Sequence, residues 1–297
     1  MRIREGWFGG VFPTWLVPSA RLRITLIYWW RHGRPPRLRH PRRFTELVQR
    51  RKLADRDWRL VSHSDKVAVK DHVAAVLGAD WTNPTVWHGR ELPAEPPSAL
   101  PLVVKARYGC GQIMFVRTHA DWDLARRRAP AWLSRRYGRW LDEWAYAHIP
   151  RGILVEPMLG DGGTLPVDYK FIVIGGRVAC IEVHVGRATA HRWSVLSRDW
   201  ALLSSSGNSP TPPASLAAMI AGAERLGAAH DCVRIDLYEV DGRPVFGEMT
   251  FYPGSGFTPI AAPGLDAAMG AAWLCVLPDQ GAGLGSDNQF PERKRSL

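Results

Sequence analysis

Two carboxylates and one arginine are predicted to share one face of a β-hairpin late in the chain. Residues 233–251 alternate apolar and polar side chains around a turn at Asp241-Gly242, which is typical of two paired strands. If the turn is a three-residue loop, all even-numbered residues share one face. That face then holds Arg234, Asp236, Tyr238, Phe246, Glu248 and Thr250. A two-residue loop would put Asp236 and Glu248 on opposite faces.

The two carboxylates suggest a metal site. Paired acids on rigid strands suit a hard cation such as Mg²⁺, which takes few protein ligands and shares phosphate oxygens. Asp236 and Glu248 are therefore candidate ligands. The alternative is a solvent-exposed network of ion pairs with Arg234.

A second candidate site combines a lysine with glycines. Lys105 ends an apolar strand and is followed by a loop that contains Gly109 and Gly111. Backbone N–H groups of such a loop, next to a lysine, can hold nucleotide phosphates. An ordinary turn is the alternative interpretation, because two glycines this close are common in turns.

Lysine is scarce in this chain, which gives each lysine more weight. Only six of the 39 basic residues are lysines, so a lysine in a strand or beside glycines indicates a need for a compact charge. Lys170 lies two residues after Asp168, on the same face of a predicted strand. A surface ion pair is the alternative for these two residues.

The elements that must position these residues are short strands mixed with helices. Helical patterns cover residues 44–77, 121–148 and 214–230, and strand patterns cover residues 102–105, 113–116, 153–156, 169–174, 177–184, 233–239 and 244–251. Many hairpins among helices indicate α+β lobes and not a doubly wound parallel sheet.

Eight short motifs occur in the order seen in TupA-like ATP-grasp proteins, and residues 38–277 resemble that family. The motifs are Phe44-Thr45-Glu46, Asp65-Lys66, residues 103–111, Glu143-Trp144-Ala145-Tyr146, Val155-Glu156-Pro157, Asp168-Tyr169-Lys170-Phe171, residues 234–238 and residues 247–251. The resemblance implies the ATP-grasp fold, in which two α+β lobes hold ATP between antiparallel sheets, here with a smaller N-terminal region.

The resemblance also implies roles in binding ATP. Lys66 and Lys105 correspond to the lysines that contact phosphates, and residues 107–112, with Gly109 and Gly111, to the loop that covers them. The remaining implied contacts are Glu156, Met158 and Leu159 at the adenine and Asp168 at the ribose.

The metal and catalytic residues follow from the same resemblance. Asp236 and Glu248 correspond to Mg²⁺ ligands, and Arg234 and Lys170 are placed in the catalytic set. Many ATP-grasp ligases have asparagine where Thr250 stands, so Thr250 is the weakest of the three predicted metal ligands. The implied activity is ligation of a carboxylate to an amine through an acyl phosphate.

The substrates follow only from what the TupA-like group is associated with. An amino acid or peptide would be attached to a uronic acid of a cell-surface polysaccharide. A basic cluster that could hold an acidic sugar comprises His184, Arg187, His191 and Arg192; an exposed basic loop is the alternative interpretation of the cluster. A glycosyltransferase or phosphotransferase of polysaccharide biosynthesis is one alternative, and a basic nucleic-acid-binding protein is another.

The positive charge is concentrated at the N-terminus. The net charge is +11, but the first 45 residues hold ten arginines and one acid, so the rest of the chain is close to neutral. Arginines interleaved with aromatic residues suit an anionic membrane surface or a phosphate-bearing partner; a solvated basic arm whose tryptophans pack on the body is the alternative. Because no folded basic face is indicated, nucleic acid is not the expected partner.

The chain is expected to be cytoplasmic, with peripheral contact at the inner membrane surface. The apolar run at residues 24–30 is far shorter than the roughly 20 residues that span a bilayer. The four cysteines lack zinc-site spacing and are expected to be reduced. The predicted divisions are a basic aromatic arm (1–43), a helical region and linker (44–100), a small lobe (101–165), a large lobe (166–277) and a disordered tail (278–297).

Overall fold

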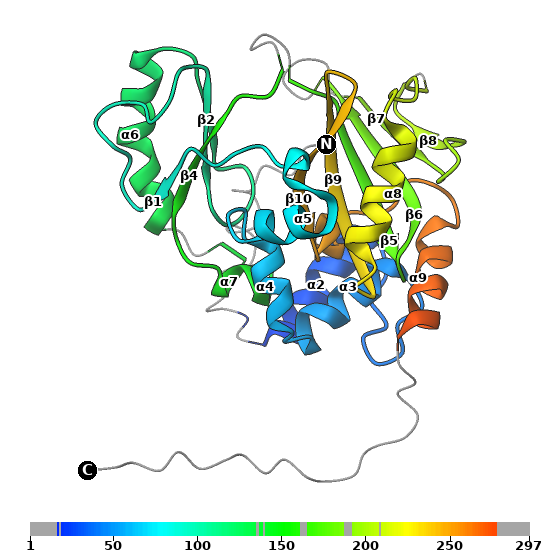
Figure 1. The fold of residues 1–297 in the computed structure, drawn as a ribbon. Helices are drawn as coiled ribbons and strands as arrows, with labels where there is room; N and C mark the ends of the chain where they lie inside the picture. The colour runs from blue at the N-terminus through cyan, green and yellow to red at the C-terminus, as the bar shows by residue number, and fades with distance from the viewer. Residues whose placement is uncertain are drawn as a thin grey trace, which may run out of the picture.

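The protein contains two antiparallel sheets (Figure 1), and each sheet has its own hydrophobic core. The computed structural model describes residues 17, 19–134, 137–138, 140–160, 165–186, 192–207 and 209–277. The predicted tail from residue 278 lies outside these residues. The predicted divisions of the chain remain predictions.

The smaller sheet has four strands in the order β1-β4-β2-β3. Its strands are β1 (Trp87–Gly89), β2 (Leu102–Ala106), β3 (Ile113–Val116) and β4 (Ile153–Pro157). Helix α6 (His119–Ser134) packs on β2 and β3, where the buried Trp122 contacts the apolar strand residues. Leu102 and Val104 of β2 lie in this core, so Lys105 points to the opposite face of the strand, where it is partly exposed.

The larger sheet has six strands in the order β10-β9-β5-β6-β7-β8. Its strands are β5 (Asp168–Ile174), β6 (Arg177–Val185), β7 (Arg192–Leu196), β8 (Leu202–Ser205), β9 (Cys232–Val240) and β10 (Arg243–Thr250). Helix α8 (Leu216–Gly227) packs on β5, β6 and β9. Val233, Ile235 and Leu237 of β9 are fully buried in the same core as α8, so Arg234 and Asp236, which alternate with them, face away from that helix.

Helices from both ends of the chain support the larger sheet. They are α2 (Ala20–His32), α3 (Phe44–Ala54), α4 (Trp58–Ser64), α5 (Val69–Leu77) and α9 (Leu265–Val276). The short elements between them are α7 (Trp144–His148) and the 3-10 turns η1 (Ala79–Trp81) and η2 (Pro253–Gly256). Buried Arg51 of α3 bonds to the Cys232 and Phe251 carbonyls and stacks on Trp273 of α9, which joins three segments far apart in sequence.

The β9–β10 hairpin corrects the predicted loop. Val240 pairs with Arg243, so the turn has two residues, Asp241 and Gly242, both with positive φ. The register nevertheless shifts by one residue between Phe246 and Glu248. A β-bulge at that point adds one unpaired residue and moves all later side chains to the other face.

The bulge residue is Gly247, and the site depends on it. A Cβ there would lie 2.9 Å from the Tyr238 ring and 3.0 Å from the Asp236 carbonyl, so any larger residue would collide. The shift places Glu248 opposite Asp236, so the two carboxylates share one face, as predicted. Phe246 lies before the shift, and the two-residue turn pairs it with Leu237 in the core. The prediction that Phe246 lies on the polar face was wrong because it placed the extra residue in the turn, whereas the structure places it after Phe246.

The hairpin of β5 and β6 also contains a β-bulge. Ile174 pairs with Arg177 around the expected two-residue turn, and the register shifts one residue further along. The extra residue is Ala179, and the shift brings Lys170 opposite Glu182. Without it, Lys170 would pair with the apolar Ile181.

The second half of the N-terminal arm packs on the body. Residues 24, 27 and 28 of α2 are buried, and the Tyr28 hydroxyl lies 2.9 Å from the Thr45 hydroxyl of α3. Trp29 and Trp30 remain exposed. Packing on the body therefore holds for one face of α2, and contact with a membrane stays a prediction. Residues 1–16 lie outside the described chain.

Two observations concern the surroundings of the fold. No helix in the described part of the chain combines the length and apolar character needed to cross a membrane. None of the four cysteines forms a disulfide; Cys110 and Cys275 are exposed, and Cys180 and Cys232 are buried.

Three histidines form a cluster where α4, α5 and β9 meet. The His63 Nδ1 and His230 Nε2 atoms are 2.9 Å apart, and the His63 ring stacks on His72. The pKa of His63 and the pKa of His230 are both lowered to about 4. Burial is the largest cause, and repulsion from a neighbouring histidine is the next. The folded state therefore favours neutral rings.

We expect this cluster to make stability depend on pH. An unfolded histidine titrates near pKa ~6.5, so the neutral rings stabilise the fold fully above that pH and lose their effect as the pH falls toward 4. The expected loss is on the order of 2 kcal/mol, because His63 is partly solvent-screened. Urea unfolding at pH 7.5 and 4.5 should show that the free energy of unfolding falls less in His63→Gln than in the wild type. An equal fall in both proteins would show that His63 does not contribute to the pH dependence.

Candidate functional site

Four charged residues stand opposite one another across four strands of the larger sheet. Glu182 of β6 pairs with Lys170 of β5, and Lys170 also pairs with Asp236 of β9. Asp236 in turn pairs with Glu248 of β10. Because directly paired side chains lie on one face, these residues form a charged row on the face opposite α8.

Arg234 connects the acids of this row. Its Nε atom lies 2.6 Å from the Asp236 carboxylate, and its Nη2 atom lies 2.8 Å from Asp236 and 2.9 Å from Glu248. Burial by itself lowers the pKa of Arg234, but the two carboxylates outweigh it and hold that pKa well above its usual value. The Thr250 hydroxyl donates to Glu248 at 3.2 Å, so the three predicted metal-binding side chains converge on one guanidinium.

Lys170 holds the opposite side of Asp236. Its ammonium group donates to Asp168 at 3.0 Å and also to Asp236. Asp236 is only 2% exposed in its side chain, whereas the Glu248 side chain is 31% exposed. Asp236 is thus fixed between two cations, and Glu248 is the carboxylate that is open to a ligand.

Lys66 joins the two halves of the candidate site. Its Nζ atom donates to the Gly109 carbonyl at 2.5 Å and lies 3.8 Å from the Glu248 carboxylate. Its backbone N–H donates to the Arg107 carbonyl. The predicted phosphate loop and the predicted metal carboxylate are therefore within reach of one lysine.

On the smaller sheet, Glu156 is held by two lysines. Lys105 donates to one carboxylate oxygen at 2.6 Å, and Lys70 donates to the other. Burial by itself raises the pKa of Glu156, but the two ammonium groups lower it below its usual value. Lys70 also donates to the Asn83 carbonyl and the Thr85 hydroxyl, each at 2.6 Å.

Sequence reasoning missed Lys70 and Glu182. Lys70 is one of the six lysines and follows Lys66 by one helical turn, so the scarcity of lysine could have identified it. Glu182 could not be found by counting from the turn, because the bulge at Ala179 changes its partner.

Most of the predicted nucleotide contacts lie on or beside β2 and β4 of the smaller sheet, whereas Asp168 begins β5 of the larger sheet. Gly109 and Gly111 have φ values of +78° and +80°, which glycine adopts without strain. Met158 is buried, and its backbone N–H donates to the Pro101 carbonyl, so this N–H already has a hydrogen-bond acceptor within the protein. Leu159 follows β4 directly. The adenine and ribose roles remain predictions.

The donor set fits a Mg²⁺ ion that shares ligands with phosphate. In the described residues, no three histidine, cysteine or acidic side chains are grouped to hold a metal. Two carboxylates on a rigid pair of strands are what Mg²⁺ takes from a protein when phosphate oxygens and water complete its octahedron. Asp236 and Glu248 would hold the ion, with Thr250 beside them, and the ion would neutralise phosphate charge.

The family model for TupA-like ATP-grasp proteins matches residues 46–274, which include every residue of the site described above. The chain belongs to the TupA-like ATP-grasp family. The predicted family is thereby confirmed. The predicted α+β ATP-grasp fold is also confirmed, since the family match is accompanied by two antiparallel sheets.

Solved structures resemble this TupA-like ATP-grasp protein at low identity. D-alanine–D-alanine ligase from Bacillus anthracis, complexed with ATP, has 16% sequence identity and a TM-score of 0.45; the alignment covers 71% of this chain and 61% of the ligase chain. L-amino acid ligase from Bacillus licheniformis is 17% identical with a TM-score of 0.45, covering 71% and 50%. VanG D-Ala:D-Ser ligase from Enterococcus faecalis is 13% identical with a TM-score of 0.47, covering 72% and 61%.

The aligned part of this TupA-like protein spans half to three fifths of the length of these structures. A comparison with curated proteins finds no match. In the predicted basic cluster, His184 of β6 pairs with Trp193, next to Arg192 of β7. Arg187 and His191 lie outside the described residues.

The exposed thiol on the glycine loop offers a direct test of ATP binding. We expect ATP to slow alkylation of Cys110, because the loop should close over the phosphates, and to leave Cys275 on α9 unaffected. With ATP well above its Kd, the protection should be about tenfold or more. Mass spectrometry after timed iodoacetamide treatment measures both rates in one sample. Equal rates at Cys110 with and without ATP would place the nucleotide elsewhere.

Proposed function

We propose that this protein is an ATP-dependent ligase that joins a carboxylate to an amine through an acyl phosphate. The observation that carries the proposal is the position of Lys66, whose ammonium group reaches both the Gly109 carbonyl and Glu248. A nucleotide whose phosphates lay at this lysine would have its terminal phosphate beside the charged row of the larger sheet.

The reaction has two balanced steps. A carboxylate oxygen of the first substrate attacks the γ-phosphorus of ATP, and the bond to the bridging oxygen breaks to release ADP. The amine nitrogen of the second substrate then attacks the acyl carbon, phosphate leaves, and the nitrogen loses a proton. Both steps need positioning and charge neutralisation more than covalent help from the protein.

The side chains divide these tasks. Lys66 and Lys105 would contact the phosphates, and Arg234 would stabilise the oxyanion that develops at the acyl carbon. Lys170 acts through Asp236, which it holds in place. Its role is therefore to position a metal ligand.

We further propose that the carboxylate belongs to a uronic acid of a cell-surface polysaccharide or its precursor, and that the amine belongs to an amino acid or peptide. His184 and Arg192, at the β6–β7 end of the larger sheet, suit an acidic sugar by charge. Such an enzyme would work on the cytoplasmic side, near the membrane where glycan precursors are assembled.

Product analysis tests the reaction. Incubation with ATP, Mg²⁺, uronic acids and amino acids should yield ADP, phosphate and an amide in equal amounts. A glycosyltransferase would form a glycosidic bond without this stoichiometry, and a phosphotransferase would release ADP but keep the phosphate on its acceptor. Either pattern would replace the ligase proposal.

A further inference from the structure

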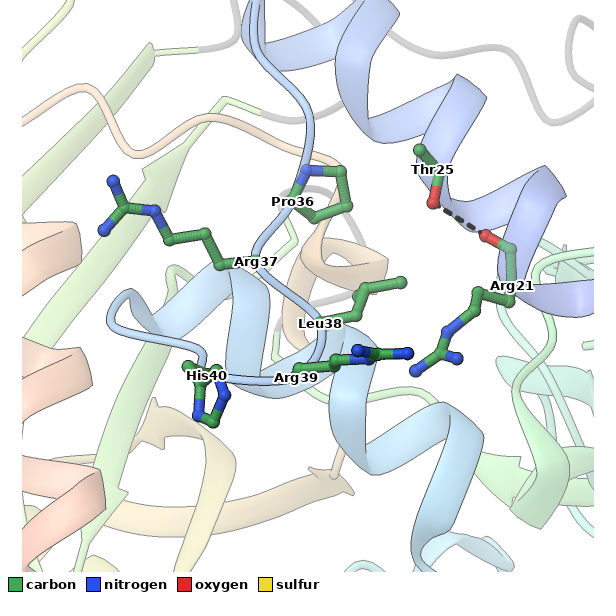
Figure 2. A pocket seen from close by; sticks show the side chains of 7 residues that line it. All are labelled: Arg21, Thr25, Pro36, Arg37, Leu38, Arg39 and His40. Atoms are coloured by element: carbon green, nitrogen blue, oxygen red, sulfur yellow. Dashed lines mark hydrogen bonds between the residues drawn. The ribbon is translucent and has the colours of Figure 1, made fainter.

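An open cavity of about 500 Å³ lies between helix α2 and the loop of residues 36–40 (Figure 2). Helix α2 contributes Arg21 and Thr25, and the loop forms the other wall. The volume falls within the roughly 300–1,000 Å³ of small-molecule sites. None of its lining residues belongs to the charged row or to the glycine loop.

The cavity is lined by cations without acidic partners. Within the described chain, the side chains of Arg21, Arg37 and Arg39 form no ion pair, and all three are exposed. Other arginines of the same segment are neutralised, in the pairs Arg23–Asp142, Arg34–Glu46 and Arg43–Asp266. The positive charge at this cavity is therefore unbalanced.

Two of these arginines converge. In Figure 2, the guanidinium groups of Arg21 and Arg39 extend toward one another past Leu38, whereas Arg37 points away. Like charges that approach each other repel unless an anion lies between them. Phosphate suits this arrangement, because the planar donors of two guanidinium groups match its oxygens.

The helix itself is fixed in place. Ile24 and Tyr28 are fully buried, and the Thr25 hydroxyl donates to the Arg21 carbonyl at 2.8 Å. The far end of the helix is held by His32, whose Nε2 atom lies 3.2 Å from the Gly256 carbonyl. One wall of the cavity is thus rigid before any ligand arrives.

We propose that this cavity binds a phosphate or diphosphate group, with Arg21 and Arg39 as its principal contacts. Trp29 continues the stripe of Arg21 and Thr25 at intervals of four residues and is 56% exposed. Arginine beside an exposed tryptophan is typical of the lipid–water interface, where a phosphate is part of a lipid headgroup. A soluble phosphate ester would present the same group.

The test uses two probes and a parent protein that lacks the two lysines of the proposed ATP site. In a Lys66→Met/Lys105→Met protein, pyrophosphate binding is measured by calorimetry. Sedimentation is measured with phosphatidylcholine vesicles that contain or lack phosphatidic acid. Because these two lysines belong to the proposed ATP site, the result at the cavity does not depend on whether the ligase proposal holds.

The informative variant is Arg21→Gln/Arg39→Gln, and the matched control is Arg127→Gln/Arg128→Gln. The control removes two exposed arginines of α6 that also form no ion pair in the described chain. Losing two charge-assisted contacts should weaken binding by about tenfold or more, while the control stays near the parent protein.

The probes separate the sources of the phosphate. Loss of pyrophosphate binding in the cavity variant supports a site for soluble phosphate groups, and loss confined to phosphatidic acid vesicles supports a lipid headgroup. The proposal is overturned if the parent protein binds neither probe. It is also overturned if the cavity variant and the control bind both probes equally well.

Discussion

Glu248→Gln should reduce turnover by about 10²–10³-fold and leave the fold intact. Removal of a group that neutralises charge at a transferring phosphate typically has an effect of this size. Because the Glu248 side chain is 31% exposed, the free energy of unfolding should change by less than about 1 kcal/mol. Steady-state kinetics across a range of Mg²⁺ concentrations, with urea unfolding, measures both quantities.

Asp236→Asn provides the contrast. It should lose as much activity as Glu248→Gln, but it also removes the charge that Lys170 and Arg234 share in a site that is almost fully buried. Breaking a buried pair of this kind costs about 3–5 kcal/mol. An active Glu248→Gln enzyme would remove Glu248 from the metal site, whatever Asp236→Asn does.

Lys105→Met should weaken ATP binding by about ten- to a hundredfold, the effect of losing one hydrogen bond to a charged group. Lys105→Arg should not restore binding, because a planar fork cannot replace a compact ammonium group. Both variants should keep near wild-type stability, since Lys70 still neutralises Glu156. Equilibrium binding of a fluorescent ATP analogue distinguishes the variants.

Lys70→Met is the matched control. Lys70 also bonds to Glu156, but it satisfies the Asn83 carbonyl and the Thr85 hydroxyl as well. We expect it to lower the free energy of unfolding by about 2 kcal/mol and to affect ATP affinity less than Lys105→Met does. Wild-type ATP affinity in Lys105→Arg would show that Lys105 lies outside the nucleotide site.

The sequence predicted the strands of the site better than their register. Alternation in residues 233–251 marks both strands of the hairpin, and ordered short motifs indicated the family. The register of a hairpin depends on the position of the extra residue at a β-bulge. The alternation of apolar and polar residues does not reveal that position when the extra residue is a small one such as Gly247 or Ala179. The error at Phe246 and the omission of Glu182 share this cause.

The N-terminal arm shows a second limit. Its composition is basic and aromatic, but whether an aromatic residue packs or projects depends on the helix face, and interruptions in the pattern concealed the helix. In α2, Tyr28 is buried while Trp29 is exposed, although they are adjacent. A deletion that included α2 would therefore expose part of a core, so substitution of its exposed arginines tests the arm without disturbing the fold.

The charged groups of the candidate site are paired with one another. Lys66 lies near Glu248, Lys105 bonds to Glu156, and Arg234 spans two carboxylates. ATP binding would thus be an ion exchange, in which phosphates take cations from acids and a metal ion occupies the acids that are released. Each ligand would remove the competitor of the other, so the affinities for ATP and Mg²⁺ should rise together by the same factor.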